Sequence, residues 1–358
     1  MRGVVWDGVR LHLTDELAVR QPGPGEAQVR VLASGICHSD LNAMDYPMMP
    51  TPIVLGHEAA GVVKAIGAGV VNVKVGEPVM VGSQTPCGHC RECESERYIA
   101  CDMTYAPVAP PFTWLGQPTH SFANISSFAS TITVKAEQLV NTEGLKPAAA
   151  ALVGCAVSTG YGAARNLGQV RRGDVVVVFG VGGIGINAIQ GARVAGAAQV
   201  VAVDINADKE SAARRFGTTD FVLLPRGLDA NGIAAHVTVA VGAPVDVVIE
   251  CSGAPAAVEA SIRIPKRSGT CVLVGQPAPQ AMASFNVFGL TMGRNIVSQL
   301  NGGTNPRRDF AALIDLARKG EIDIDSQITK VWPLAEFETA MAALRSGEVV
   351  RAVLDHTA

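Results

Sequence analysis

The sequence predicts an α/β protein of two domains, in which a mainly antiparallel β region is followed by a doubly wound parallel sheet. The chain has 358 residues, enough for two domains of about 150 residues each. Short apolar runs separated by glycine and proline turns fill the chain up to about residue 155. From Asp174 onward, apolar runs alternate with helical patterns. That alternation is typical of parallel strands joined by helices.

Three short runs in the first region illustrate its β character. Ala27–Ala33, Gly61–Ile66 and Pro78–Gly82 are of strand length, and the turn residues Pro22–Gly25 stand before the first of them. Short strands with such tight turns predict a mainly antiparallel arrangement.

The second region and the tail predict a longer series of elements. After the glycine-ended strand Val175–Phe179, an alanine-rich pattern predicts a helix at Ile184–Ala195. Further strands are expected at 200–203, 221–224, 245–249 and 270–274, the last being the final strand of the series, with a helix at 207–216. The tail predicts helices at 309–318 and 334–344 and a terminal strand at 349–354.

Composition narrows the class of partner. The formal net charge is -3 and there is no basic block, which argues against nucleic acid or an anionic membrane surface as a partner. The N-terminal stretch has no apolar core of a signal peptide, and the apolar runs are of strand length, well short of a membrane span. We therefore expect a soluble, cytoplasmic protein.

Four of the eight cysteines form one compact motif, C-x2-C-x2-C-x7-C. Structural zinc sites prefer four thiolates in a tetrahedron, and two-residue spacers let one loop wrap around the ion. An iron–sulfur cluster also takes four thiolates, and disulfides or unligated thiols are further alternatives. The segment is polar and rich in charge, which is unusual for core cysteines. The predicted structural zinc ligands are Cys87, Cys90, Cys93 and Cys101, with His89 facing solvent.

Three dispersed motifs together predict a second metal site. Cys37 follows a strand, His57 precedes one, and Cys155 lies where the two regions meet. Taken singly, each is a weak signal, because a lone cysteine near a glycine is usually a small buried hydrophobe. Together they supply two thiolates and an imidazole, which leaves a fourth position of zinc open for substrate. Zinc in such a site polarises an alcohol oxygen and lowers its pKa.

Three polar residues next to these ligands have candidate roles. Ser39 can accept the proton that the alcohol loses, although a turn hydroxyl more often bonds to backbone. Asp40 can hydrogen-bond the second ring nitrogen of His57 and fix its tautomer, unless it is a solvated turn carboxylate. Glu58 can approach the metal during ligand exchange, or pair with a nearby cation.

A glycine-rich loop predicts a dinucleotide site. The sequence Gly180-Val-Gly182-Gly183-Ile184-Gly185 follows a strand and opens a helix, and the acidic residue Asp204 ends the next strand, 19 residues after Gly185. The glycines let the backbone approach a pyrophosphate at the helix N-terminus. Asp204 would bond the ribose hydroxyls and repel a 2′-phosphate, so NAD is favoured over NADP. The alternative is a glycine-rich turn of an unrelated α/β fold.

Along nearly its full length the chain resembles the zinc-containing, medium-chain alcohol dehydrogenases, for which the Cys₂His zinc set is known. It looks most similar to the long-form branch of liver-type alcohol dehydrogenases and thiol-dependent formaldehyde dehydrogenases. The resemblance is carried by the motifs GICHSD (35–40), GHEAAG (56–61), the four-cysteine loop, GCAVSTGYG (154–162), FGVGGIG (179–185), VAVDINADK (201–209) and SGEVVRAVL (346–354).

The resemblance implies the fold, the cofactors and several residue roles. It implies a GroES-like catalytic domain (residues 1–156 and 300–358), a Rossmann NAD-binding domain (157–299), two zinc ions per chain, and a homodimer or homotetramer. Cys37, His57 and Cys155 would hold the catalytic zinc, with Glu58 as an occasional extra ligand, and Ser39 would carry the proton. The positions implied to contact the cofactor are His38, Thr159, Gly180, Gly182, Gly183, Ile184, Gly185, Asp204, Lys209 and Arg351.

The chain departs from the liver-type pattern at several positions. A histidine that passes the proton to solvent in many members is Asn42 here, and asparagine cannot act as a base at neutral pH. The loop after Cys101 is shorter. In the substrate pocket Ser83 stands where liver-type enzymes have a bulky aromatic, Phe122 keeps an aromatic, and Ala123 replaces a larger apolar residue. These positions predict a roomier pocket, suited to aromatic or longer primary alcohols and aldehydes.

Two rival functions remain open at this stage. A thiol-adduct formaldehyde dehydrogenase would use the same zinc and NAD on a hemithioacetal. A catalytically silent protein that binds zinc and NAD on the same fold is a rival of another class, against which the complete Cys37, His57 and Cys155 set argues. Cys251 and Cys271 fall at the ends of predicted strands and are interpreted as buried structural residues.

Overall fold

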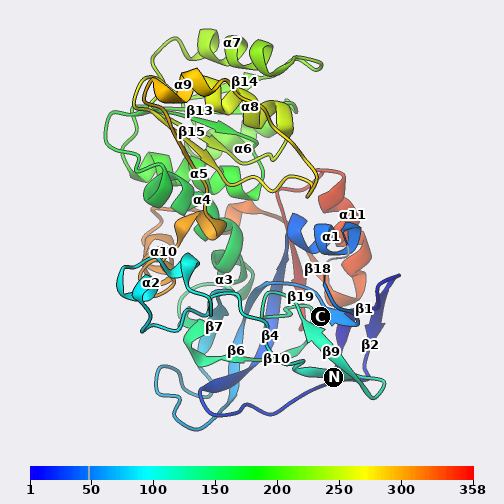
Figure 1. Ribbon diagram of the computed structural model, residues 1–358. Coiled ribbons are helices and arrows are strands. Elements are labelled where there is room, and N and C mark those ends of the chain that lie inside the picture. The colour runs from blue at the N-terminus through cyan, green and yellow to red at the C-terminus, as the bar shows by residue number, and fades with distance from the viewer. Residues whose placement is uncertain (47–48) are drawn as a thin grey trace. The chain divides into compact units, whose positions relative to one another are not determined.

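The computed structural model describes residues 1–46 and 49–358 (Figure 1). The chain forms two compact units, the first made of residues 1–155 and 305–358 and the second of residues 156–304. The sequence placed the second boundary at residues 299 and 300. Residues 300–304 belong with the second unit instead, where the Thr304 hydroxyl donates to the Ser158 carbonyl at 3.3 Å and Gly302 packs against the backbone of Thr159.

The first unit is built on two sheets. Their strands are β1 (Gly3–Trp6), β2 (Leu11–Thr14), β3 (Leu17–Val19), β4 (Glu26–Ile36), β5 (Ile53–Val54), β6 (Glu58–Ile66), β7 (Pro78–Val81), β8 (Phe112–Trp114), β9 (Gln117–Ser121), β10 (Thr131–Lys135), β11 (Leu139–Asn141), β18 (Ile328–Pro333) and β19 (Arg351–Asp355). One sheet has the order β2-β1-β5-β9-β8-β3, and the other β11-β7-β6-β4-β19-β18, with β10 also paired to β4. Within the described residues, only the pairs β5·β9 and β18·β19 are parallel in these sheets.

Strand β4 organises the larger sheet and places the candidate site. Its end pairs antiparallel with the start of β6, where Gly35 lies opposite Glu58, and with β19, where Ile36 lies opposite Ala352. The residues that follow β4, those that begin β6 and Arg351 at the start of β19 are therefore brought together at one end of the sheet. Inward-facing side chains such as Val29 and Ile132 are fully buried in the core below them.

Helices complete the first unit. They are α1 (His38–Asp45), α2 (Arg91–Glu94), α3 (Pro147–Leu152), α10 (Asp309–Arg318) and α11 (Phe337–Arg345), with short 3₁₀ turns η1 (Tyr98–Ala100), η2 (Ala136–Gln138), η6 (Asp325–Gln327) and η7 (Leu334–Glu336). Helix α10 has the bounds that the sequence predicts. The other predicted tail helix, 334–344, is divided between η7 and α11.

The helical stretch 147–167 was not predicted from the sequence. Pro147 begins it as α3, the π-helix η3 (Val153–Val157) follows and contains Cys155, and α4 (Ser158–Gly162) and a second π-helix, η4 (Ala163–Leu167), complete it. By length and composition this is the one helical stretch in the described part of the chain that is apolar enough to cross a membrane, but 78% of the relevant window is buried inside the protein. Such burial is typical of a core helix.

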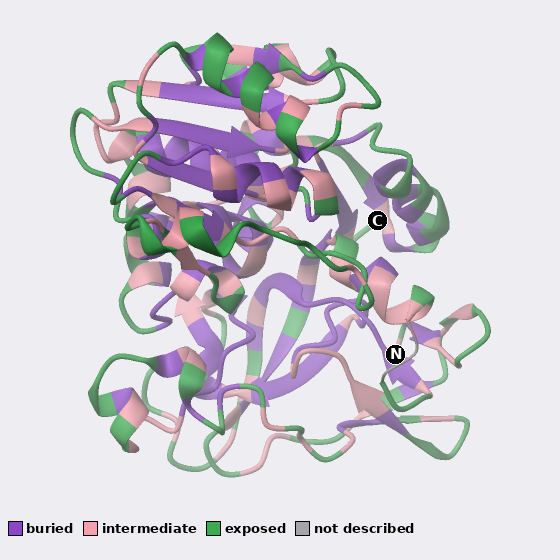
Figure 2. Ribbon diagram, turned by 45° about the horizontal axis from the view of Figure 1, so that its top comes forward, coloured by how far each residue is buried: buried purple, intermediate pink, exposed green. Residues whose placement is uncertain are grey.

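The second unit contains one parallel sheet, which Figure 2 shows as a buried layer between helices whose outer faces are exposed. Its strands are β12 (Val175–Phe179), β13 (Gln199–Asp204), β14 (Asp220–Leu223), β15 (Val247–Glu250), β16 (Thr270–Leu273) and β17 (Asn295–Val297). Its helices are α5 (Gly183–Val194), α6 (Lys209–Phe216), α7 (Ala230–Val241), α8 (Pro255–Arg263) and α9 (Val287–Thr291), with the 3₁₀ turn η5 (Leu300–Gly303).

The strand order of this sheet confirms the predicted doubly wound fold. It is β14-β13-β12-β15-β16-β17, so the chain first winds outward from β12 to one edge and then returns to build the other half from β15. The switch point between β12 and β15 is where ligands bind in sheets of this kind, beyond the carboxyl ends of the strands. The prediction that 270–274 is the last strand was wrong. Strand β17 is only three residues long and too short to give a periodic pattern.

Candidate functional site

The structure brings Cys37, His57, Glu58 and Cys155 together in the first unit. One ligand atom from each lies within 4.8 Å of all the others. Cys37 directly follows β4, His57 and Glu58 begin β6, and Cys155 comes from the π-helix η3. A π-helical turn shifts the side-chain register of a helix and is frequent at functional sites, which explains why an otherwise apolar helix presents a thiol here.

Asp40 holds two of these residues in place. Its carboxylate is fully buried and accepts hydrogen bonds from the Cys37 backbone N–H at 2.9 Å and the Gly56 backbone N–H at 3.1 Å. The same carboxylate lies 3.0 Å from Nδ1 of His57. Burial lowers the pKa of His57, but the charge and hydrogen bond of Asp40 outweigh it, and the pKa stands well above its usual value. Asp40 therefore directs Nε2 of His57 toward the thiols.

Ser39 and Phe122 lie against the other parts of the imidazole. The Ser39 hydroxyl is 3.1 Å from His57 Nε2, the nitrogen on the side of the thiols. The Phe122 ring meets the His57 ring edge-on, with their centroids 5.5 Å apart. The predicted proton acceptor and one predicted pocket residue are thus both at this cluster.

Glu58 forms a buried ion pair with Arg351. Both side chains are almost fully buried, and Arg351 Nη2 donates to Glu58 Oε2. Glu58 Oε1 has no hydrogen-bond partner in the described structure. The resemblance placed Arg351 at the cofactor pyrophosphate. The structure gives its guanidinium a partner at the metal cluster, and the contact with the cofactor stays a prediction.

The two thiols of this cluster have opposite tendencies to ionise. The hydrogen bond from Cys155 holds the pKa of Cys37 well below its usual value, and the same interaction raises the pKa of Cys155 well above its own. Two facing thiols whose pKa values move in opposite directions fit a divalent cation between them, since metal ligation deprotonates thiols. The donor set, with one unpartnered carboxylate oxygen beside it, fits zinc.

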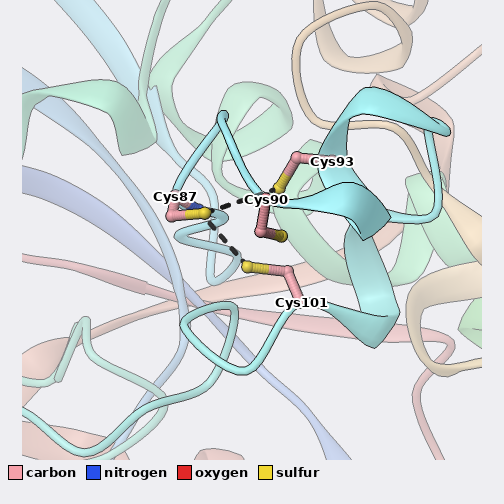
Figure 3. Close-up of side chains that lie close together, drawn as sticks. All are labelled: Cys87, Cys90, Cys93 and Cys101. Atoms are coloured by element: carbon pink, nitrogen blue, oxygen red, sulfur yellow. Dashed lines mark hydrogen bonds between the residues drawn. The ribbon is translucent and has the colours of Figure 1, made fainter.

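Figure 3 shows the four sulfur atoms of the second cluster, Cys87, Cys90, Cys93 and Cys101, turned toward one another. Their Sγ atoms all lie within 4.8 Å, and those of Cys87 and Cys93 are 3.9 Å apart. A tetrahedron with zinc–sulfur bonds of about 2.3 Å has sulfur atoms roughly 3.8 Å apart. The loop is therefore folded to the size of a four-thiolate zinc site.

Backbone donors in the same loop favour thiolates. The Cys87 N–H donates to Cys101 Sγ at 3.4 Å, and the Gly88 N–H donates to Cys93 Sγ at 3.3 Å. Burial raises the pKa of Cys101, but the N–H donors of Cys87 and Met103 bring it down to about 6. Burial dominates at Cys93 and raises its pKa to about 12. The pKa values of Cys101 and Cys93 thus differ widely, which again fits a group of thiols that closes around a cation. His89 is exposed, as expected.

The glycine-rich loop in the second unit has the geometry of a phosphate cradle. Gly180 adopts a φ of +85°, which favours glycine. A Cβ on Gly182 would meet no atom within 4 Å, so the space above it is open to a ligand. A Cβ on Gly185 would lie 1.8 Å from the Gly180 carbonyl oxygen, so that glycine lets the helix pack against the strand. These are the three roles of glycines in a dinucleotide-binding turn, and the loop fits NAD.

Asp204 ties the end of β13 to this loop. One carboxylate oxygen accepts from the Val181 backbone N–H at 2.8 Å, and the other from the Asn206 N–H at 2.9 Å. Gly183 and Ile184 open helix α5, and Lys209 opens α6. Thr159 lies buried in α4, whereas His38, in the first unit, is exposed at the start of α1. The roles expected of these residues toward a cofactor stay predictions.

Tyr105 is a further residue close to Cys155 that the sequence did not predict. Burial raises the pKa of its phenol, the charge of Cys155 raises it further, and the Ser83 and Gln84 side chains lower it. The phenol therefore lies near Cys155 and beside the predicted pocket residue Ser83, and stays protonated at neutral pH. Ala123 adopts a φ of +51° in the same unit. The one signal for Tyr105 in the sequence is its position four residues after the last cysteine of the loop.

Comparison with known proteins identifies the family. Residues 23–144 match the alcohol dehydrogenase GroES-like domain, and residues 183–319 match the zinc-binding dehydrogenase family. The chain is 36% identical to putative alcohol dehydrogenase D of Mycobacterium tuberculosis over 356 residues, with 95% of each chain covered. The chain belongs to the zinc-containing medium-chain alcohol dehydrogenases.

Further members of the family show the same extent of likeness. The NDMA-dependent alcohol dehydrogenase of Amycolatopsis methanolica is 33% identical, with 96% of this chain and 95% of the relative covered. A zinc-binding domain alcohol dehydrogenase from Burkholderia ambifaria superposes with a TM-score of 0.91 at 30% identity, and covers 99% of this chain and 98% of its own. Benzyl alcohol dehydrogenase from Acinetobacter calcoaceticus superposes with a TM-score of 0.88 at 26% identity, with the same coverage. The likeness extends over both units and does not select the liver-type branch.

Proposed function

We propose that this alcohol dehydrogenase depends on zinc and NAD and reversibly oxidises primary alcohols, preferably aromatic or longer-chain ones, to aldehydes. The observation that carries the proposal is the convergence of Cys37, His57 and Cys155 within 4.8 Å, with Glu58 beside them. Three protein ligands are the number that a catalytic zinc site uses, because the fourth position is left for substrate.

The chain's own residues hold and deprotonate the substrate in this proposal. Cys37, His57 and Cys155 hold zinc, which when bound supplies a Lewis acid for the alcohol oxygen. Asp40 keeps the imidazole in one tautomer. The Ser39 hydroxyl, 3.1 Å from His57 Nε2, accepts the proton that the alcohol releases. Asn42 cannot take it further as a base, so the proton leaves from Ser39 to water or the cofactor ribose.

The second unit binds the nucleotide in this proposal. NAD accepts a hydride when bound, and the loop Gly180–Gly185 leaves room for its pyrophosphate above Gly182. Asp204 keeps a carboxylate at the end of β13, where the ribose hydroxyls of NAD are bound in such folds and a 2′-phosphate is repelled. The four-cysteine loop would hold the second zinc ion of each chain.

The preference for larger alcohols rests on the pocket residues. Ser83 is small and buried, Ala123 is small, and Phe122 contributes an aromatic face that contacts His57. An aromatic wall with small neighbours suits a flat or long apolar substrate. One structural neighbour is named a benzyl alcohol dehydrogenase, which agrees with this preference.

We further propose that the protein is a homodimer or homotetramer. In the second unit, Met282, Val287 and Phe288, in the segment that precedes the edge strand β17, expose between 65% and 83% of their surface. Exposed large apolar side chains in one segment are typical of an interface between subunits. A cytoplasmic location also stays a prediction.

A substrate screen tests the proposed function. Formation of NADH is followed by absorbance with ethanol, benzyl alcohol and medium-chain alkanols, and with formaldehyde in the presence and absence of a low-molecular-weight thiol. We expect kcat/KM for benzyl alcohol to exceed that for ethanol. Oxidation of formaldehyde only with added thiol would favour the thiol-adduct formaldehyde dehydrogenase instead. Failure to turn over any alcohol or aldehyde, despite bound zinc and NAD, would favour the catalytically silent protein.

A further inference from the structure

Glu250 is a buried carboxylate at the switch point of the parallel sheet to which the proposed function gives no role. It is the last residue of β15, and its exposed fraction is 0%. Strand β15 lies beside β12, whose end leads into the glycine-rich loop. An ionisable side chain is costly to bury, so its position at this point calls for compensating partners.

Those partners come from the turn that follows β15. Oε1 of Glu250 accepts hydrogen bonds from the Ser252 backbone N–H at 2.8 Å, from the Ser252 hydroxyl, and from the Gly253 N–H at 3.1 Å. Oε2 accepts from the same Gly253 N–H at 3.1 Å. Burial raises the pKa of Glu250, while the Ser252 and Gly253 donors lower it. These contacts fold the turn back over the end of its own strand.

The turn is packed between the turns of the two neighbouring strands. A Cβ on Gly180, in the glycine-rich loop, would lie 3.2 Å from the Ser252 backbone and side chain. A Cβ on Gly275, after β16, would lie 2.6 Å from Glu250 Oε2 and 2.3 Å from the Gly253 nitrogen. The three turns are therefore in close contact, and we expect a shift of the Ser252–Gly253 segment to reach the loop at Gly180 as well.

We propose that Glu250 is a positioning residue for the cofactor: by holding the Ser252–Gly253 turn against Gly180, it keeps the glycine-rich loop in the shape that binds the pyrophosphate. The inference rests on the proposed binding of NAD. Glu250 itself does not contact the predicted pyrophosphate site, because both of its carboxylate oxygens accept hydrogen bonds from the Ser252–Gly253 turn. Its loss therefore weakens binding of the cofactor and leaves the metal clusters of the first unit intact.

The decisive variant is Glu250→Gln, which keeps the size of the side chain and replaces one acceptor oxygen by a donor. Hydrogen bonds to a charged group are worth more than neutral ones, and an amide N–H facing the Gly253 N–H repels it. We expect the Kd for NADH, measured by quenching of protein fluorescence, to rise by about tenfold or more. KM for NAD rises with it, kcat at saturating NAD changes by less than about threefold, and zinc content is unchanged.

Asp246→Asn is the matched control. Asp246 directly precedes the same strand at its opposite end, accepts from the Val175 backbone N–H at 2.9 Å and pairs with Lys266. It also joins β15 to β12, but at the amino end, away from the predicted cofactor site. We expect Asp246→Asn to lower the thermal midpoint and to leave the Kd for NADH unchanged. Equal Kd increases in both variants would mean that Glu250 acts only through stability, and would overturn the inference.

Two further results separate the possible failures. If the wild-type protein does not bind NADH, the proposed function fails. If the wild-type protein and Glu250→Gln bind NADH equally well, only the role of Glu250 fails.

Should Glu250→Gln not fold, a second variant tests the same contact: Ser252→Ala removes one donor to the same oxygen and keeps the charge of Glu250. A rise of about threefold or more in its Kd, at an unchanged thermal midpoint, supports the inference, and an unchanged Kd overturns it.

Discussion

Replacing Asp40 by asparagine tests how the protein orients the proposed ligands of the catalytic metal. Three donors converge on this fully buried carboxylate, at 2.9 Å from Cys37, 3.1 Å from Gly56 and 3.0 Å from His57 Nδ1. Asparagine offers one acceptor oxygen, and its amide would face at least one of these donors. Loss of one hydrogen bond to a charged group costs about 1.5–3 kcal/mol. That corresponds to roughly a 10- to 100-fold loss of zinc affinity, the range expected when a partner of a ligating histidine is removed.

The assay is chelator competition with a colorimetric zinc indicator, in which the four-cysteine site of the same molecule serves as the internal reference. In Asp40→Asn, one zinc per chain should leave at a 10- to 100-fold lower chelator concentration, while the other leaves as in the wild type. Asp45→Asn, at the far end of the same helix α1, removes a surface ion pair with Arg345 and should change neither release. Wild-type zinc affinity at both sites of Asp40→Asn would refute this account of Asp40.

Two other substitutions test the pocket and the pH dependence of stability. Ser83→Phe should restore the bulk of liver-type pockets. We therefore expect kcat/KM for benzyl alcohol to fall at least about tenfold relative to kcat/KM for ethanol, at unchanged zinc content. An unchanged ratio of the two kcat/KM values would place Ser83 outside the pocket. Burial lowers the pKa of His356 to about 4 in the folded protein, against 6.5 when unfolded, so the unfolded chain binds the extra proton between these values. The stability that neutral His356 contributes is complete above pH 6.5 and is lost as the pH falls toward 4. When the pH is lowered from 7 to 5, the free energy of unfolding measured in urea should fall by roughly 2 kcal/mol less in His356→Gln than in the wild type. Equal falls in the two proteins would contradict the buried, neutral state of His356.

Motifs with fixed spacing could be interpreted from the sequence because the spacing itself determines how their residues are arranged in space. The four-cysteine loop and the glycine-rich turn are local, so spacing alone defines which atoms meet. Cys37, His57 and Cys155 are distant in the chain, and only the combination of residue types predicted their meeting. The register of β4 against β6 is what places Cys37 beside His57.

Other features could not be found in this way because they depend on packing between distant segments. Cys155 lies in a π-helix, and no residue pattern predicted either that turn or the helix around it. The ion pair of Arg351 with Glu58 joins residues far apart in the sequence, and folding alone brings Tyr105 close to Cys155. Strand β17 has no periodicity of its own and forms by pairing with β16.

Zinc content and turnover of the wild-type protein and of Cys37→Ala test whether Cys37 holds a catalytic zinc ion. The wild type should contain two zinc ions per chain and form NADH from an alcohol. Cys37→Ala should contain one zinc ion, held by the four-cysteine loop, and should lose turnover while binding NADH with unchanged affinity. Wild-type turnover in Cys37→Ala, or two retained zinc ions, would contradict the assignment of the catalytic metal site.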